Sequence, residues 1–474
     1  MTATSSSPSR LSGAPHDWVD RCLLAGPDDQ ECLRFGAPVA RGALRALVAE
    51  QAERLTAAGL SGGGTAALRL APSLGYTAAL LACWRLGVQA VLLDHRLTAH
   101  EVALAVERLA PQVLVESADR PGGALRGFAE TDPVPKALPG GRPAATGHAL
   151  VQLSSGSTGP AKVIARTAAD LLRELDCYRR LKLFPKAGER VVLLSSMVHV
   201  LGLVGGLLNS LHAGAPLTVP ERTTTAGILA AIAGDDRPTT LIGVPFHAEL
   251  LAAAAPPPLP QLRRMIVAGE LVRPGLPAAF TARYGVPLGT MYGMTELGVI
   301  ATDLDGTLHP EAAPVHGMEP HEEGGELHLA MAASPYPGLA DPTRWSDGRL
   351  HTRDAARVDP ATGRVTVLGR RDSQVSIGGL KVDLNEVEHT LAALPEVREA
   401  VVVFADGAIE AYLAAEGEAA PTAVQDALTR ELASFKRPRR LSFLPALPRT
   451  TTGKLVRDTT ALRAAAGAAA TPAR

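Results

Sequence analysis

The sequence predicts an α/β fold: a large N-terminal domain of layered αβ subdomains with a β-rich subdomain, followed by a small α+β domain. Three observations lead to this prediction. Short apolar strands alternate with amphipathic helices as far as residues 265–268, which is typical of layered, largely parallel sheets. Beyond residue 325, short strands are separated by Gly, Pro and Asp turns. The chain has 474 residues, more than one compact domain usually contains, and 46% of them are hydrophobic.

The N-terminal half supplies the alternation. Apolar residues at helical spacing predict a helix over residues 43–60, and Thr98 with Glu101 has the spacing of a capping box for a later helix. The other expected elements are a helix over 74–86 and strands at 65–70, 88–93, 112–116, 191–194, 217–219, 240–244 and 265–268.

The C-terminal half has shorter elements. Strands are expected at 325–330, 349–352, 364–368 and 399–404 and helices over 384–394 and 424–434. The Ala-rich end after Leu462 predicts a frayed tail. Residues 1–15 are rich in Ser, Pro and Gly and lack an apolar segment, which predicts a short disordered tail rather than a signal peptide.

Composition excludes several classes of function. The net charge is -1, from 47 basic and 48 acidic residues, so neither nucleic acid nor an anionic membrane is an expected partner. No uninterrupted apolar run reaches spanning length. The four cysteines are scattered without a C-x-x-C pair, which disfavours a disulfide framework and favours a cytoplasmic protein.

Lysine is unusually rare. It occurs seven times among the 47 basic residues. Because arginine does not replace a compact, strongly hydrated ammonium, each lysine is a pointer to a chemical need.

A loop rich in hydroxyls and glycines ends in one of these lysines. Its candidate ligands are Ser155, Gly156, Ser157, Thr158, Gly159 and Lys162. Glycines let backbone N–H groups approach phosphate oxygens, hydroxyls donate, and the ammonium neutralises charge. The spacing is not that of a P-loop. A linker is the alternative interpretation, and Lys162 favours the phosphate cradle.

Three further segments carry potential chemistry. The segment 291–296 combines the ring of Tyr292, able to stack on a base, with Thr295 and the carboxylate of Glu296, able to hold hydrated Mg²⁺. Asp354 and the charged turn 369–372 form the second segment, for which the alternative interpretation is ordinary turn charges exposed to solvent. Lys454 lies on a Thr/Gly loop and alone would be an ordinary surface lysine.

In this order and spacing, the motifs resemble the adenylate-forming superfamily of acyl-CoA synthetases, nonribosomal peptide adenylation domains and firefly luciferase. The resemblance covers nearly the whole chain. The matching segments are the loop at Ser155, residues 197–202, residues 292–296, Asp354, residues 369–372 and Lys454. The resemblance implies an ATP- and acid-binding domain over residues 1–371 and a small mobile domain with the catalytic lysine over 372–474.

The resemblance also implies roles for single residues. ATP would be bound by Ser155, Gly156, Ser157, Thr158, Gly159, Lys162, Gly269, Tyr292, Asp354 and Arg370. Catalytic roles would fall to His199, Thr295, Glu296 and Lys454. Glu296 would help to place Mg²⁺, and Lys454 would bridge the substrate carboxylate and the α-phosphate. Asp372 would be the hinge, and Gly378 and Gly379 would line the pantetheine path.

The implied reaction has two steps. A carboxylate attacks the α-phosphorus of ATP and releases pyrophosphate, and a pantetheine thiol then attacks the acyl-adenylate and releases AMP. Coenzyme A and a carrier-protein arm present the same pantetheine, so the motif fits either acceptor.

The acid pocket would be lined by His199, Val200, Gly269, Gly293, Met294 and Gly298. No Asp or Glu occurs between Arg190 and Glu221, which argues against an α-amino acid, because a buried ammonium needs a partner. The loop and residues 164–167 look most similar to ligases of hydroxybenzoates. An aromatic acid is therefore the expected substrate, with aliphatic acids as the alternative.

The chain departs from the family pattern at residues 160–163, and at Arg353, where glycine is usual. Three other functions remain as alternatives. A luciferase-like oxidising enzyme would share every adenylation motif. A non-catalytic scaffold would not need Lys454. A kinase or ATPase would release ADP and would need a P-loop, whose spacing the sequence does not contain.

Overall fold

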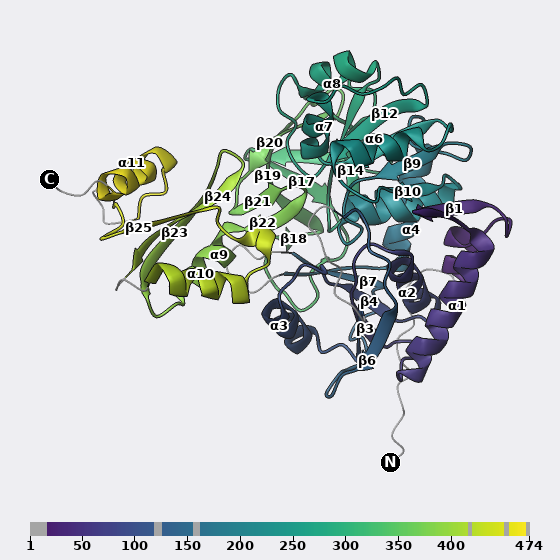
Figure 1. Ribbon diagram of the computed structural model, residues 1–474, viewed down its shortest axis with the longest axis horizontal. Helices are drawn as coiled ribbons and strands as arrows, with labels where there is room; N and C mark the ends of the chain where they lie inside the picture. The colour runs from purple at the N-terminus through teal and green to yellow at the C-terminus, as the bar shows by residue number, and fades with distance from the viewer. Residues whose placement is uncertain (1–16, 118–125, 155–161, 416–419, 450–454, 471–474) are drawn as a thin grey trace. The chain divides into compact units, whose positions relative to one another are not determined.

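The computed structural model describes residues 17–117, 126–154, 162–415, 420–449 and 455–470 (Figure 1). The chain forms two compact units. The large unit comprises Met1–His95, Ala110–Leu153 and Val163–Gly369, and the small unit comprises Arg96–Leu109, Ser154–Lys162 and Arg370–Arg474.

A nine-stranded sheet crosses the described part of the large unit. Its spatial order is β15 (Ala313–Pro314), β14 (Gly298–Asp303), β13 (Leu288–Met294), β12 (Leu262–Ala268), β11 (Thr239–Gly243), β9 (Arg190–Leu193), β10 (Leu217–Val219), β1 (Glu31–Phe35) and β2 (Ala37–Ala40). From β13 to β1 all neighbours pair in parallel, whereas the pairs of β14, β15 and β2 are antiparallel. Parallel strands buried on both faces explain the continuous apolar runs of the sequence.

A six-stranded sheet forms the second layer. Its order is β6 (Pro133–Ala137), β5 (Val113–Ser117), β3 (Thr65–Arg69), β4 (Gln89–Leu92), β7 (Leu150–Ser154) and β8 (Lys162–Arg166). The long helices α1 (Arg41–Ala57) and α2 (Leu74–Arg85) lie side by side next to this sheet (Figure 1). Nearly every side chain of α2 is buried, as expected for a helix enclosed on all sides.

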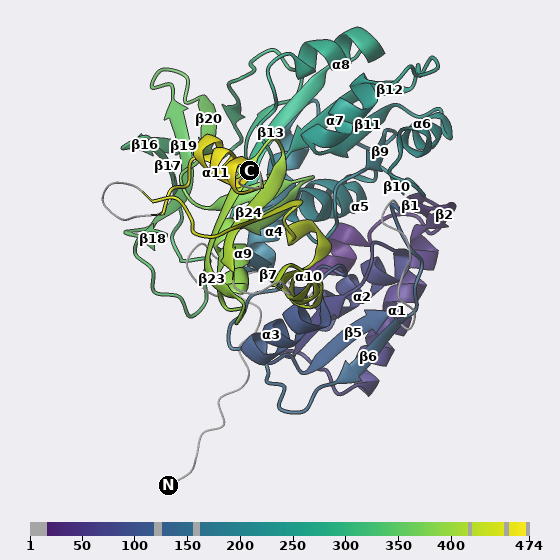
Figure 2. The same ribbon diagram turned by 60° about the vertical axis from the view of Figure 1, so that its left-hand side comes forward.

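The remaining helices of the large unit cover the sheets. They are η1 (Val19–Leu23), α4 (Ala168–Arg180), η2 (Leu201–Leu208), α5 (Asn209–Ala213), α6 (Thr225–Ala233), α7 (Pro245–Ala252) and α8 (Leu276–Tyr284). Helices α7 and α8 pack together along β12 and β13 (Figure 2). Helix α4 begins at a capping box in which Thr167 and Asp170 exchange side-chain-to-backbone hydrogen bonds.

The β-rich part of the large unit is a smaller sheet. Its strands are β16 (Pro320–Glu323), β17 (Glu326–Ala330), β19 (Arg349–Val358) and β18 (Trp345–Ser346), with β20 (Val365–Arg370) paired to β19. Leu327, Leu329 and Leu350 point into one buried cluster with Ile300 of β14, so one face of this sheet shares a core with the nine-stranded sheet.

The small unit has an α+β architecture. Its elements are α3 (Ala99–Leu109), β21 (Gln374–Ile377), β22 (Leu380–Asp383), α9 (Leu384–Ala392), β23 (Val397–Ala405), β24 (Ala408–Ala415), α10 (Ala420–Glu431), η3 (Ser434–Lys436), β25 (Arg440–Leu444) and α11 (Thr459–Ala470). Helix α9 packs on β23 (Figure 2). Lys436 is buried and its Nζ lies 2.6 Å from Glu386 and 2.9 Å from Glu101.

The predicted fold class is confirmed. The capping box is also confirmed, because Thr98 N donates to Glu101 Oε2 and Glu101 N donates to Thr98 Oγ1. The prediction of a frayed end after Leu462 was wrong: this segment belongs to α11, which buries Leu462 against β23–β25. The expected domain boundary at residue 372 stays a prediction. Within the described residues, no helix combines the length and the apolar character needed to cross a bilayer.

Candidate active site

A buried carboxylate faces a tyrosine hydroxyl in the large unit. Tyr292 lies on β13 and donates a hydrogen bond of 2.6 Å from its hydroxyl to Asp354 Oδ2 on β19. Asp354 is only 6% exposed. Both residues were predicted to bind the nucleotide, and the structure brings them together although 62 residues separate them.

A bulge in β19 positions Asp354. His328 pairs with His351 and Glu326 with Ala355, so the residues between them on β19 outnumber the single Leu327 opposite. Thr352 Oγ1 fills the bulge by donating to Leu327 O at 2.8 Å and accepting from Asp354 N at 3.0 Å. Bulges are common beside active sites because they redirect one side chain.

The backbone of this bulge is strained. Arg353, which stands where the family pattern has glycine, adopts φ +63°. The left-handed region costs a side-chain-bearing residue roughly 1–2 kcal/mol. Arg353 N donates to Glu326 Oε1 at 3.0 Å, so the neighbouring strand helps to maintain this conformation.

The Thr-Glu motif lies in the turn between β13 and β14. Thr295 and Glu296 are half-buried there, and Tyr336 donates to Glu296 Oε1 at 2.8 Å. A carboxylate oriented by one hydrogen bond is a suitable ligand for a Mg²⁺ ion that keeps most of its waters. Tyr336 was missed by the sequence analysis, because nothing in its local sequence distinguishes it from a loop residue.

A buried ion pair fixes the far side of this turn. Arg166 of β8 and Glu174 of α4 are almost completely buried, and Arg166 Nη1 lies 2.7 Å from Glu174 Oε2. Glu174 Oε1 accepts from Val299 N at 3.1 Å, and Arg166 donates to Leu297 O at 3.4 Å. Between them Gly298 has φ +87°, and a Cβ there would lie 2.1 Å from the Glu174 carboxylate. Glycine is therefore required for packing at this position, and its role in the acid pocket stays a prediction.

Burial and the adjacent Glu174 carboxylate raise the pKa of Tyr178, which is on the same helix. The phenol therefore remains protonated at neutral pH.

His199 has a carboxylate neighbour that the local sequence does not reveal. Its Nε2 lies 3.9 Å from Oδ2 of Asp94, a buried residue after β4. No acidic residue occurs in 191–220, and the inference that this disfavours an α-amino acid stays a prediction. Asp94 is far away in the chain and reaches His199 through the fold.

The segment carrying His199 is rigidly supported. Tyr76 of α2 donates to Met197 O at 2.9 Å, and Gln152 of β7 donates to Val198 O. A Cβ at Gly202 would lie 2.2 Å from Ser196 O, so the backbone turns tightly before η2. Val200 is half-buried at the start of this turn.

The other predicted residues of the large unit lie at strand ends. Gly269 follows β12 with φ +93°, and Gly293 and Met294 end β13. Parallel strands place these carboxyl ends at one edge of the sheet, where ligands of open α/β sheets bind.

The small unit holds the remaining described candidates. Arg370 donates from Nε and Nη2 to the carboxylate of Asp372 at 2.9 and 2.6 Å. Gly378 and Gly379 connect β21 and β22 with φ +57° and +81°. Positive φ at both positions defines the two-residue hairpin turn that glycine favours, so these residues have a structural reason apart from pantetheine. Lys162 is the first residue of β8. Ser155, Gly156, Ser157, Thr158, Gly159 and Lys454 lie outside the described residues.

The strand ends of the sheet carry glycines and the Thr-Glu turn, and Tyr292 of β13 pairs with the buried Asp354. Comparison with known proteins identifies the class of protein. Residues 27–321 match the AMP-binding enzyme family, and residues 386–454 match the AMP-binding enzyme C-terminal domain. The chain belongs to this family and is an AMP-forming acid–thiol ligase that uses ATP.

Individual relatives are moderately similar. The p-hydroxybenzoic acid–AMP ligase FadD22 of Mycobacterium tuberculosis is 29% identical over 476 residues, which cover 93% of this chain and 67% of that protein. The benzoate–CoA ligase of Thauera aromatica is 28% identical over 65% of each chain. A solved double mutant of o-succinylbenzoate CoA synthetase from Bacillus subtilis has a TM-score of 0.79 at 23% identity, covering 94% of this chain and 98% of that one. This last similarity establishes the fold.

Replacing Glu174 by Gln should lower the free energy of unfolding by about 3–5 kcal/mol, because it leaves the buried Arg166 charge without its partner. Urea titration followed by circular dichroism measures the change. Asp176→Asn is the matched control, since it removes exposed ion pairs with Arg179 and Arg180 on the same helix and should cost no more than about 1 kcal/mol. Equal losses in the two variants would contradict the structural role of the buried pair.

The strain at Arg353 predicts an inverted order of two variants. Arg353→Gly should be more stable than Arg353→Ala by about 0.5–1 kcal/mol, because relief of left-handed strain exceeds the entropy cost of glycine. At Arg349, an exposed residue of the same strand outside the positive-φ residues, the order should be the usual one, with Ala more stable than Gly. The same urea titration measures all four variants. An Ala variant that is the more stable at both positions would contradict the strain.

Proposed function

We propose that this chain activates an aromatic carboxylic acid to its acyl-adenylate and transfers the acyl group to a pantetheine thiol. The observation that carries the aromatic assignment is the relationship to the p-hydroxybenzoic acid–AMP ligase, which extends over 93% of the chain. The similarity to a benzoate–CoA ligase over 65% of the chain points to the same class of acid.

The nucleotide end of the site follows from the Asp–Tyr pair. Asp354 is buried and oriented by Tyr292, so its carboxylate is suited to accept hydrogen bonds from both ribose hydroxyls, while the tyrosine ring and Gly269 frame the adenine. Arg370 assists Asp354. The loop residues Ser155, Gly156, Ser157, Thr158, Gly159 and Lys162 bind the β- and γ-phosphates. A Gly-rich loop and an ammonium suit these oxygens.

At the reacting centre, the chain's groups stabilise developing charge. Thr295 contacts the α-phosphate, and Glu296, oriented by Tyr336, holds the Mg²⁺ ion that neutralises phosphate oxygens. Lys454 bridges the substrate carboxylate and the α-phosphate, where negative charge accumulates during adenylation.

The acid lies against the strand ends and the segment of His199. The apolar residues Val200 and Met294 and the small Gly293 and Gly298 suit a flat ring. His199, with Asp94 behind it at 3.9 Å, offers a polar contact for a ring substituent. A fixed polar group in an otherwise apolar wall is how a pocket discriminates one substituted ring from another.

The second half-reaction uses the small unit. Asp372 acts as the hinge about which this unit turns between adenylation and thiolysis. Gly378 and Gly379 lack side chains at the turn that the pantetheine arm passes. Coenzyme A and a carrier protein both present a pantetheine arm, so either can be the acceptor.

A panel of acids tests the proposal. The full chain is incubated with ATP, Mg²⁺ and benzoic, hydroxybenzoic, aminobenzoic, cinnamic or aliphatic acids, with and without CoA, and products are identified by mass spectrometry. Aromatic acyl-adenylate with pyrophosphate is the expected product. Aromatic acyl-CoA with AMP would identify CoA as the acceptor, whereas an adenylate that persists with CoA would identify a carrier protein. Turnover of aliphatic acids alone would refute the aromatic assignment.

Lys454→Ala should reduce acyl-adenylate formation by at least about 100-fold, the scale on which removal of one preorganised electrostatic contact acts. Thiolysis of supplied acyl-adenylate should be nearly unchanged. Lys136, which is exposed on β6, provides the control, and Lys136→Ala should leave both half-reactions intact. Pyrophosphate exchange and thiol consumption measure the two steps separately. An equal loss in both half-reactions would contradict the role assigned to Lys454.

A further inference from the structure

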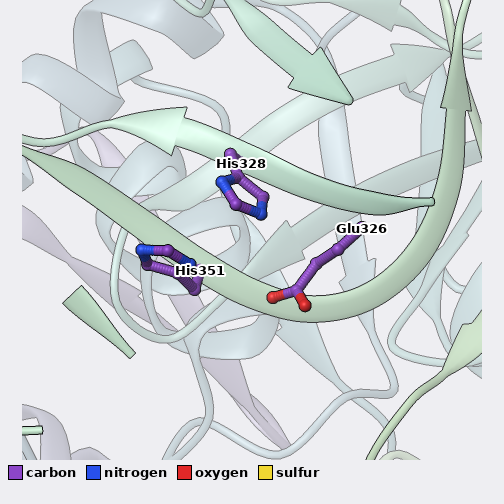
Figure 3. Close-up of side chains that lie close together, drawn as sticks. All are labelled: Glu326, His328 and His351. Carbon is purple, nitrogen blue, oxygen red and sulfur yellow. The ribbon is translucent and has the colours of Figure 1, made fainter. Parts of the chain in front are cut away.

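Two histidines and a glutamate, none of them assigned to the reaction, meet on the β-rich sheet next to the bulge of β19. Glu326 and His328 lie on β17, and His351 lies on the neighbouring β19. His328 and His351 are directly paired in the sheet register, so their side chains project from the same face. Figure 3 shows the Glu326 carboxylate directed toward the two imidazole rings.

The three side chains are close enough to share one ion. One potential ligand atom from each lies within 4.8 Å of the other two, and the imidazole centroids are 4.5 Å apart. Ligands of one tetrahedral zinc ion, with bonds of about 2.0–2.2 Å, are about 3.3–3.6 Å apart. The atoms therefore need to approach one another by little more than about 1 Å, which side-chain rotation can supply.

His328 has an unsatisfied nitrogen. The residue is 7% exposed, and its Nδ1 makes no hydrogen bond within the described structure. A buried polar atom without a hydrogen bond costs about 1–3 kcal/mol, so it requires an explanation. Oε2 of Glu323 lies 3.8 Å from this nitrogen, which is too far for a hydrogen bond.

The other two side chains are already oriented by neighbours. Glu326 Oε1 accepts from Arg353 N at 3.0 Å, and His351 Nε2 lies 2.9 Å from Ser346 Oγ. Metal ligands are usually held in this way by a second hydrogen bond that fixes the ring or the carboxylate.

We propose that Glu326, His328 and His351 form a binding site for one divalent transition-metal ion, zinc being the metal that suits them best. Two imidazoles and one carboxylate are a ligand set that zinc and related borderline metals accept, whereas Mg²⁺ and Ca²⁺ prefer oxygen. The site is separate from the Mg²⁺ assigned to Glu296 and does not depend on the proposed function. His321 and Glu323 are the candidates for a further ligand. His321 of β16 is paired with His328 of β17, and Glu323 Oε2 lies 3.8 Å from His328 Nδ1.

The ion would join β17 to β19 next to the bulge that presents Asp354. Because Arg353 N bonds directly to Glu326, occupancy of the site would stabilise the bulge in its present form. The expected effect is structural: the metal raises the stability of the folded chain with the logarithm of its concentration above Kd.

The experiment uses the full chain, stripped with EDTA and titrated with ZnCl2 or CoCl2. The expected result is one equivalent of zinc by elemental analysis after desalting, a rise in Tm with added zinc, and a visible cobalt absorption band of low-symmetry coordination. His328→Asn should weaken zinc binding by at least about 100-fold, more than loss of an outer contact costs. His351→Asn, at a less buried position, should do the same if the first variant folds poorly.

His100→Asn is the matched control. His100 is exposed on α3, and its variant should bind zinc like the unmodified chain. The proposal is overturned if the stripped chain, after titration with ZnCl2 and desalting, holds no zinc and shows no rise in Tm. It is equally overturned if the variants at His328 and His351 bind zinc as tightly as the control, which would make the histidine pair a packing contact only.

Discussion

The buried Arg166–Glu174 pair is the constraint on which the candidate site depends. Two charges removed from water are tolerated only when their remaining hydrogen-bonding capacity is used. Here part of that capacity is directed at backbone groups of Leu297 and Val299, so the ion pair connects β8, α4 and β14. The turn between β13 and β14 is thereby fixed at its far end, and Glu296 is fixed at its near end by Tyr336. The carboxylate that we propose to hold Mg²⁺ is useful only at a defined position, and these contacts define it.

Much of the fold was predictable because burial imposes periodicity on the sequence. The helix and strand alternation and the capping box at Thr98 and Glu101 depend on local spacing, which a sequence displays directly. The end of the chain was not predictable in this way. Its Ala-rich composition suggested fraying, but the packing of Leu462 against the sheet of the small unit is a tertiary effect that stabilises α11 beyond its intrinsic propensity.

The candidate site divides in the same manner. Tyr292, Glu296 and Asp354 were found because each belongs to a recognisable motif. Tyr336 beside Glu296 and Asp94 beside His199 were not, because these contacts arise from the fold and not from local sequence. Arg353 is an intermediate case. The sequence shows that arginine replaces the usual glycine, but only the structure shows that the backbone keeps the left-handed conformation at this position.

The scarcity of lysine has a consequence for an enzyme that makes mixed anhydrides. An acyl-adenylate that escapes acylates amines, and this chain offers only seven lysines. Lys436 is not among the reactive ones. Burial alone would lower its pKa, but the charges of Glu386 and Glu101 outweigh that effect and raise it. Its nitrogen stays an ammonium without a lone pair to attack with. Arginine at most of the basic positions, and two carboxylates around Lys436, leave few amines that such an intermediate could acylate.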